Sequence, residues 1–175
     1  MFKRIRQVIL ALTAKITLYD RDFVSKWLNQ AEQNLFWSMN LPDQQHAINV
    51  AYTAQELFRQ RQIKIDQINL IKCCLLHDIG KVKGDVSTID KILLVVCYQF
   101  MPGWARQWQK AGKGNIVQNF RHALYIYEYH PQLGAEKLRQ IGRADLADII
   151  AKHHQLAKST DQLELVLLRD ADELN

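Results

Sequence analysis

The sequence has few of the residues that interrupt helices or cross-link chains. Of its 175 residues, seven are glycine, three are proline and three are cysteine. The vicinal Cys73 and Cys74 and the isolated Cys97 form neither a Cys-x-x-Cys pair nor a disulfide framework. We therefore expect buried free thiols and, by default, a reducing cytoplasmic location. No apolar run approaches the roughly 20 residues that cross a bilayer, so we expect no membrane span.

The remaining composition favours a compact helical protein. Hydrophobic residues make up 48% of the chain, which is long enough to bury a core without disulfide or metal staples. The net charge of +5 fits an anionic, nucleotide-like small molecule. It is too small and too dispersed to require nucleic acid, so we expect no stable nucleic-acid complex.

Apolar residues recur at helical spacing along nearly the whole chain, and we find no convincing alternating strand. The first residues superficially resemble a signal peptide, but the apolar part is short and Lys15 ends it. We expect an amphipathic helix over residues 4–16 instead. Further helices are expected over residues 20–38, from Leu41, after Asp66, after Pro131, over residues 146–154 and from Leu163. Without repeats or a linker, this predicts a single all-α domain.

Capping residues indicate where two of these helices begin and one ends. Asn40-Leu41-Pro42-Asp43 combines a polar cap, a proline in the first turn and an acid near the positive helix end. His46 then points inward one turn later. Asp66 is expected to cap the next helix, and Gly80 to end it in a left-handed turn.

The His77-Asp78 doublet lies at the end of this apolar helix, just before Gly80 and Lys81. Imidazole and carboxylate together supply a nitrogen and an oxygen ligand for a divalent metal ion. Adjacent residues on an intact helix diverge by about 100°. The pair therefore converges on one ion most easily where the helix loosens, next to the glycine.

Other histidines and acids recur at suitable places. They are His46, His130, His153, His154 and Asp172, which leaves His122 as the one histidine outside the set. Each has an ordinary structural alternative: a hydrogen-bonded core histidine for His46, a cap or turn for His130, one buried and one exposed residue for His153-His154, and a surface acid for Asp172. Five such coincidences on apolar helix faces are harder to accept than one metal site.

The ligand types favour Fe, Mn, Zn, Co or Ni, and the lack of thiolates disfavours a structural zinc site. Two ions about 3.5–4 Å apart can share a bridging hydroxide and clamp a phosphate. We expect Asp78 to bridge two divalent transition-metal ions. His46, His77 and Asp172 would hold one ion, and His130 with His153 or His154 the other.

No acidic residue occurs between Lys91 and Tyr127, where Trp104 and Trp108 alternate with cations. Those we assign to substrate binding are Arg106, Lys110, Lys113 and Arg121. The stretch fits either a basic lid that attracts a phosphorylated substrate or a helical hairpin with a solvated basic face. A membrane-surface segment is a third alternative.

Together, these residues resemble the HD superfamily of metal-dependent phosphohydrolases. The matching order is His46-Ala-Ile-Asn-Val-Ala, Leu-Leu-His77-Asp78-Ile-Gly-Lys81, His130-Pro-Gln-Leu-Gly-Ala-Glu, Ile-Ile-Ala-Lys-His153-His154 and Asp-Ala-Asp172-Glu-Leu. The resemblance covers residues 43–175. It implies an all-α bundle around a metal cleft and hydrolysis of a nucleotide or dinucleotide phosphoester. We expect residues 1–40 to form N-terminal helices packed on an HD-type hydrolase domain over residues 41–175.

The longer motif is most similar to the HD-GYP branch, in which a lysine at the position of Lys81 binds phosphate. We accordingly expect Asp78 and Lys81 to be catalytic. Gln155-Leu156-Ala157 replaces the Gly-Tyr-Pro segment, and Pro42 stands where an acid can bind a third metal. Two metals are therefore expected, and cyclic di-GMP is not assigned as substrate. Small bacterial HD hydrolases of dinucleoside polyphosphates share the length and the His-Asp-x-x-Lys segment.

Other functions and one ligand choice stay open at this point. A non-catalytic HD signalling or scaffold module would tolerate loss of a ligand, and an HD-type di-iron oxygenase would need redox-active iron. Asp170 is an alternative to Asp172 as the last ligand, although the Ala-Asp-x-Leu context favours Asp172. Because Asp172 lies three residues before Asn175, its helix needs an anchor, and a second copy of the chain in a homodimer is one candidate.

Overall fold

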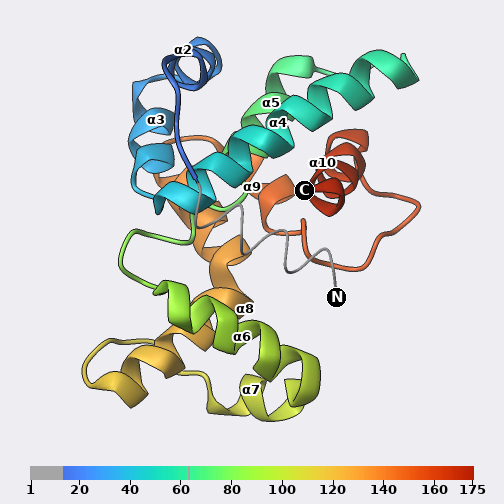
Figure 1. Cartoon of the computed structure of the whole chain (residues 1–175). Helices are drawn as coiled ribbons and strands as arrows, with labels where there is room; N and C mark the ends of the chain where they lie inside the picture. Colours follow the sequence, from blue (N-terminus) through green and yellow to red (C-terminus); the bar gives the residue numbers. More distant parts are fainter. Residues whose placement is uncertain (1–13, 63) are drawn as a thin grey trace.

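The protein is all-helical (Figure 1). The computed structural model describes residues 14–62 and 64–175, and this part of the chain forms nine α-helices and no β-strand. One isolated antiparallel bridge joins Met39 to Val82. The helices are α2 (Leu18–Trp27), α3 (Gln30–Trp37), α4 (Leu41–Arg61), α5 (Gln67–Leu76), α6 (Thr88–Phe100), α7 (Pro102–Trp108), α8 (Ile116–Gln140), α9 (Ala144–Ile150) and α10 (Leu163–Leu174). The prediction of an all-α fold is confirmed. Among the described helices, none has the length and apolar character of a membrane span.

The N-terminal region differs from the two long helices that were expected. The helix over residues 4–16 falls mostly outside the described residues, and residues 14–17 are not helical. The single helix over residues 20–38 was wrong, because the chain breaks at Leu28 and restarts as α3. Asn29 and Glu32 form a capping box there, in which each side chain accepts a hydrogen bond from the other's backbone N–H. This local signal outweighs the continuous apolar pattern.

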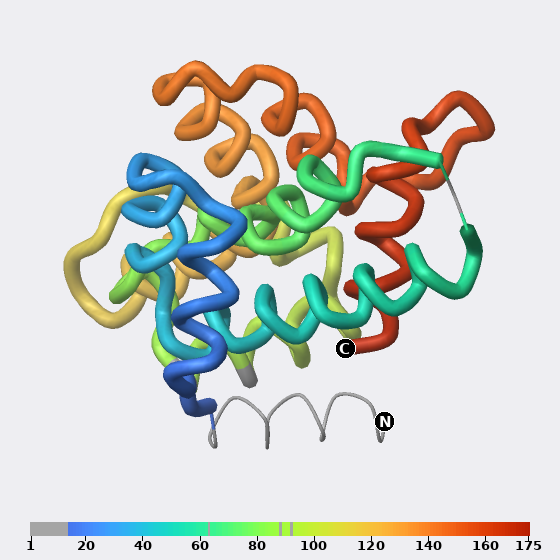
Figure 2. Tube along the Cα trace, turned by 90° about the horizontal axis from the view of Figure 1, so that it is seen from above, coloured from blue at the N-terminus to red at the C-terminus, as the bar shows by residue number. Residues whose placement is uncertain are grey.

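The larger hydrophobic core lies among α2, α3, α4, α5, the C-terminal part of α8, α9 and α10. Ile48, Leu70, Leu75, Leu146 and Leu168 are fully buried in it. Each such side chain contributes about 1.5–3 kcal/mol by leaving water. Figure 2 shows α10 lying beside α4, although the two helices are far apart in sequence. This packing brings Asp172 to His46 and Asn175 to Thr53 on α4.

A smaller core lies among α6, α7 and α8, where Leu94, Cys97, Ala105, Ala123 and Leu124 are buried. In Figure 1 α6 and α7 lie below the other helices, and α8 runs from them to the rest of the molecule. Within the part of the chain that the structure describes, two clusters of buried side chains are therefore joined by one long helix.

The expected helix after Pro131 was also wrong, because α8 already begins at Ile116 and Pro131 lies inside it. An Asn115–Gln118 capping box fixes the start. Proline has no backbone N–H, so the carbonyl of Tyr127 loses its usual helical donor. The Nδ1 atom of His130 lies 2.9 Å from that oxygen and takes over as donor.

Gly80 is required for a reason other than the predicted left-handed turn. Its φ is not positive, whereas Gly84, Gly112 and Gly142 have positive φ. A Cβ atom at Gly80 would lie only 2.1 Å from the backbone oxygen of His130. Glycine therefore allows the turn after α5 to approach the backbone of α8 directly.

Candidate metal centre

All seven predicted metal ligands come together at one place. They lie on α4 (His46), in the turn after α5 (His77, Asp78), on α8 (His130), in the turn after α9 (His153, His154) and on α10 (Asp172). They form three overlapping groups whose ligand atoms lie within 4.8 Å of one another: His46–His77–Asp172, His77–Asp78–His153 and His130–His153–His154. His77, Asp78, His130 and His153 are buried. Such a cluster is costly in an apolar interior unless its atoms have partners.

Backbone carbonyls fix the orientation of three imidazoles. The Nδ1 atoms of His77, His130 and His153 lie 2.8, 2.9 and 2.7 Å from the carbonyl oxygens of Cys74, Tyr127 and Ile150. A carbonyl oxygen can only accept, so each Nδ1–H donates. Two of these carbonyls belong to the last turns of α5 and α9, where helical donors run out. Each Nε2 atom is consequently left as an acceptor that faces the cluster, the form in which histidine binds metals.

Asp78 lies at the centre of the cluster. Its carboxylate lies 2.8 Å from Lys81 Nζ, 3.3 Å from His130 Nε2 and 3.5 Å from His77 Nε2. Among residues 14–62 and 64–175, the buried Oδ1 of Asp78 and Nε2 of His153 find no hydrogen-bond partner, although Oδ1 also lies 2.8 Å from Lys81 Nζ. Two buried acceptors directed at one small volume fit a divalent cation, which supplies what they lack.

Burial and neighbouring charges set the protonation of the cluster. Burial lowers the pKa of His153 to about 3, and burial reinforced by the charge of Lys81 lowers the pKa of His130 well below its usual value. Burial likewise lowers the pKa of His154. For Asp78, burial acts to raise the pKa, but Lys81 and the histidines outweigh it and hold the pKa well below the ordinary range. His130, His153 and His154 are thus neutral and Asp78 is anionic, as metal binding requires.

His46 and Asp172 form a distinct pair, with 2.9 Å between Nε2 and Oδ1. Burial acts to lower the pKa of His46, but the hydrogen bond to Asp172 and the charge of Asp78 outweigh it, so the pKa is raised. Asp170 instead lies 2.6 Å from Arg61, away from the cluster. The structure therefore places Asp172, and not Asp170, among the candidate ligands.

The end of α10 is held by the same chain. Asn175 Nδ2 donates to Thr53 Oγ1 on α4 at 2.9 Å and to the carbonyl of Ala171 at 2.8 Å. With the His46–Asp172 pair, these bonds anchor the helix on α4. No second copy of the chain is needed for that purpose, and the homodimer stays a prediction.

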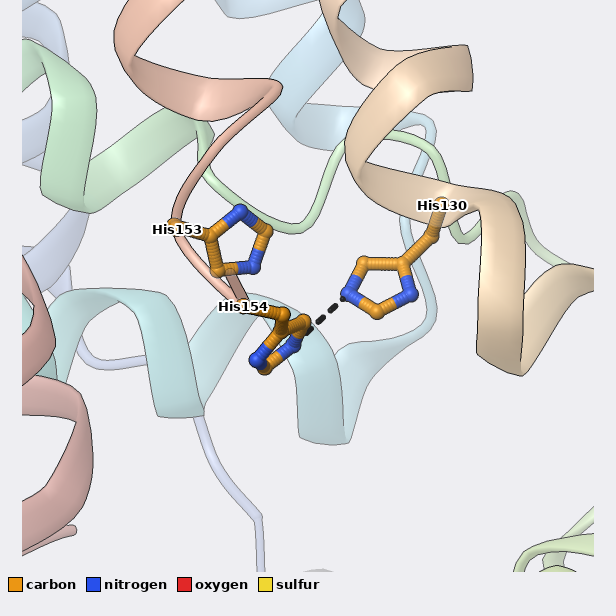
Figure 3. Close-up of side chains that lie close together, drawn as sticks. All are labelled: His130, His153 and His154. Carbon is orange, nitrogen blue, oxygen red and sulfur yellow. Dashed lines mark hydrogen bonds between the residues drawn. The ribbon is translucent and has the colours of Figure 1, made fainter. Parts of the chain in front are cut away.

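Figure 3 shows how His154, in the turn after α9, lies beside His130 of α8. Its ring faces His130, and the two Nε2 atoms lie 3.1 Å apart. Because Nδ1 of His130 donates to Tyr127, Nε2 of His130 accepts here and His154 donates. His154 is exposed, whereas the neighbouring His153 is buried.

A cavity of about 590 Å³ opens beside the cluster. Lys81 and every predicted ligand except His153 line one part of it. The remaining lining comes from the α6–α8 region: Val95, Tyr98, Arg106, Tyr127 and Glu128. The cavity therefore lies where the two hydrophobic cores meet, within the size range of small-molecule sites.

The predicted substrate-binding cations separate into two sets. Lys81 and Arg106 line the cavity, whereas Lys110, Lys113 and Arg121 do not. Lys113 lies 2.8 Å from Asp85, and the Nε–H of Arg121 donates to the carbonyl of Trp108 at 2.8 Å. Lys110 is exposed. Most of the basic stretch thus fits a helical hairpin with structural and solvated cations.

Sequence reasoning missed Tyr98, Tyr127 and Glu128 as cavity residues. The one available signal was that Glu128 ends the acid-free stretch beginning at Lys91. His122, which was left outside the metal set, is indeed elsewhere. Its Nδ1 accepts from the backbone N–H of Gly112, and its Nε2 lies 3.4 Å from Asp85.

Comparison with protein families agrees with this geometry. Residues 44–101 match the family model described as the HD domain. This segment of the chain is therefore similar to the HD domain, and HD domains generally belong to metal-dependent phosphohydrolases. The matched segment includes His46, His77, Asp78 and Lys81, while the ligands on α8, after α9 and on α10 lie beyond it. No curated protein and no solved structure matches the chain.

Proposed function

We propose that this protein is a phosphohydrolase that cleaves a nucleotide-type phosphoester with two divalent transition-metal ions. The observation that carries the proposal is the orientation of the imidazoles. Three buried Nδ1–H groups are tied to backbone carbonyls, so their Nε2 atoms converge with Asp78 beside an open cavity. A merely structural cluster of histidines has no need for unpaired buried acceptors next to a ligand-sized space.

The overlapping groups suggest how two ions would be shared. His46, His77 and Asp172 would hold one, and His130, His153 and His154 the other. Asp78 lies between them, within reach of both His77 and His130, and would bridge. When bound, such ions lower the pKa of a water molecule to near neutrality and offset the negative charge that develops on the phosphoryl group. Iron or manganese best fits this nitrogen and oxygen donor set, with zinc, cobalt and nickel as alternatives.

Lys81 would bind the phosphate itself. Its Nζ lies 2.8 Å from Asp78, and its side chain is 24% exposed where it lines the cavity. Burial acts to lower the pKa of Lys81, but the charge of Asp78 and its other acidic neighbours raise it, so the amine stays cationic. In the hydrolysis, the oxygen of water bonds to phosphorus while the ester P–O bond breaks, and the departing oxygen takes up a proton. A fixed ammonium group at the phosphoryl oxygens stabilises that transition state.

The cell compartment is part of the proposal. All three cysteines are free and buried. Buried thiols without a disulfide partner agree with a reducing compartment, and we propose the cytoplasm.

Metal content and phosphate release test this function together. Freshly purified protein, analysed by elemental mass spectrometry, is expected to hold about two transition-metal ions per chain. After loading with Mn²⁺ or Fe²⁺ it should release phosphate from nucleotides. Asp172→Asn should lose metal and turnover, whereas the matched variant Asp170→Asn, which alters only the contact with Arg61, should keep both.

Three results would contradict the proposal in different ways. Protein that stays empty after incubation with Mn²⁺ and Fe²⁺ would favour a signalling or scaffold module. Iron with a redox-sensitive visible spectrum, but without phosphate release, would favour a di-iron oxygenase. Full activity of Asp172→Asn would remove α10 from the metal centre.

A further inference from the structure

The cavity has a second lining that the metal chemistry does not use. Val95 and Tyr98 come from α6, Arg106 from α7, and Tyr127 and Glu128 from α8. A phosphoryl group held by the metals and Lys81 would occupy only part of about 590 Å³. The α6–α8 lining is therefore positioned to contact the rest of the substrate.

The two tyrosines form an aromatic platform. Their ring centroids lie 4.3 Å apart with 34° between the planes. Tyr98 is partly buried, and its hydroxyl lies 3.5 Å from the carbonyl of Leu124. Tyr127 is 42% exposed, so part of its ring remains available. A partly exposed ring supported by a second ring suits a planar aromatic ligand, because stacking needs little reordering of the side chains.

Glu128 introduces a carboxylate on this side of the cavity. Its Oε1 lies 3.6 Å from Arg106 Nε, and its side chain is 32% exposed. Burial and the charge of Glu128 together raise the pKa of the Tyr98 hydroxyl, which therefore remains protonated. A carboxylate only accepts hydrogen bonds, so it favours N–H donors, and the neighbouring Arg106 guanidinium offsets its negative charge.

The cavity lining thus combines two kinds of groups. Lys81 and the metal ligands form one part of it, and an aromatic pair with the Glu128–Arg106 ion pair forms the α6–α8 part. A substrate with one phosphate and one neutral, donor-bearing ring matches these two parts.

Building on the function proposed above, we infer that the enzyme's substrate is a nucleoside monophosphate whose base stacks on Tyr127 and donates N–H hydrogen bonds to Glu128. Guanine is the best probe, because its Watson–Crick edge presents adjacent N–H donors that suit the two oxygens of a carboxylate. Tyr127 and Glu128 are then specificity-determining residues, and the phosphate is hydrolysed beside Lys81 and the metal ligands.

The first experiment measures binding without turnover. Guanosine, which has the base but no phosphate, is titrated calorimetrically into metal-loaded wild-type protein, Glu128→Gln and Tyr127→Leu. Each variant is expected to bind about tenfold more weakly, the usual scale for losing one good hydrogen bond or stacking contact. Glu136→Gln, an exposed glutamate on the same helix, is the matched control and should bind like wild type. Thermal unfolding checks that all variants remain folded.

The second experiment compares turnover of guanosine 5′-monophosphate, ribose 5-phosphate and guanosine 5′-diphosphate. Wild type should prefer the monophosphate to ribose 5-phosphate by at least about tenfold in kcat/KM. Glu128→Gln should reduce that preference and shift the balance toward the diphosphate, since an amide no longer neutralises Arg106.

The outcomes separate this inference from the proposed function. Turnover of all three esters at similar kcat/KM, with no effect of Glu128→Gln on their ratios, would overturn the inference and leave the phosphohydrolase standing. Absence of any turnover would overturn the phosphohydrolase, and the guanosine titration would still decide whether the α6–α8 lining binds a base. Guanosine binding that is absent, or unchanged in both variants, would overturn the inference directly.

Discussion

Replacing Gly80 by alanine should damage both the fold and the metal centre, because the new methyl group meets backbone atoms. The added Cβ would lie 2.1 Å from the carbonyl oxygen of His130 and 2.7 Å from its Cα and C atoms. A backbone carbonyl inside α8 cannot rotate away as a flexible side chain can. Restoring van der Waals contact requires α8 and the turn after α5 to separate by about 1 Å.

The loss of stability and of activity follows from that separation. Overpacking of this kind typically costs about 1–3 kcal/mol, and the rigid backbone partner places Gly80→Ala in the upper part of that range. The same movement separates His130 from His77 and Asp78, which the turn carries. A misplacement of about 1 Å can reduce turnover about a hundredfold even where every ligand is retained.

Urea unfolding of metal-free protein measures the first effect, and elemental analysis with phosphate release measures the second. Gly103→Ala is the matched control, since nothing lies within 4 Å of a Cβ at that helical position. Alanine is a better helix former than glycine, so the control should be neutral or up to about 1 kcal/mol more stable. If Gly80→Ala matches wild type in free energy of unfolding and in metal content, the close approach of α8 is refuted.

Three further predictions follow from buried charges and from the metal ligands. Glu32→Ala should lower the free energy of unfolding by about 3–5 kcal/mol, because it leaves Lys72 and Arg143 facing each other without their fully buried partner. Urea unfolding measures this effect, and a loss below about 1 kcal/mol would contradict it. The Lys81→Met variant should still bind metal, since the ions themselves neutralise Asp78, but its rate of phosphate release should fall about 10²–10³-fold. Loss of metal from this variant would instead make Lys81 a structural residue. Removal of the metal with a chelator should lower the melting temperature reversibly. A metal ion that binds only the folded state contributes about 4 kcal/mol to stability at a thousand times its Kd. An unchanged melting temperature in protein shown to bind metal would contradict tight coupling of metal binding to folding.

Local patterns in the sequence were enough for the helical class and for several helix ends. Asp66 accepts hydrogen bonds from the backbone N–H groups of Ile68 and Asn69, as its position before an apolar run predicts. Pro42 and Asp43 lie in the first turn of α4, as expected. Asn40 makes no side-chain cap bond there, and its Oδ1 instead accepts weakly from Gly84, 44 residues away. Capping is a short-range interaction, so sequence predicts it well until a distant segment competes for the same atom.

The sequence by itself also determined the donor chemistry. It supplies five histidines and two acids without thiolates, in an order that resembles HD phosphohydrolases, and those seven residues do converge. Which atoms they present was decided only by tertiary structure. The carbonyls that turn the Nε2 atoms inward are left free by helix ends and by Pro131.

Contacts between distant segments decided which residues reach the metal centre and the cavity. Asp170 and Asp172 are two residues apart on α10, and only the packing of α10 on α4 directs one to Arg61 and the other to His46. Gly80 is needed because α8 crosses the turn after α5, which no local pattern around Gly80 reveals. Glu128 and Tyr98 share a cavity because α6 packs on α8. Residue types and helical periodicity are properties of short segments, whereas a site on five separate segments exists only once the burial of apolar faces has fixed their arrangement.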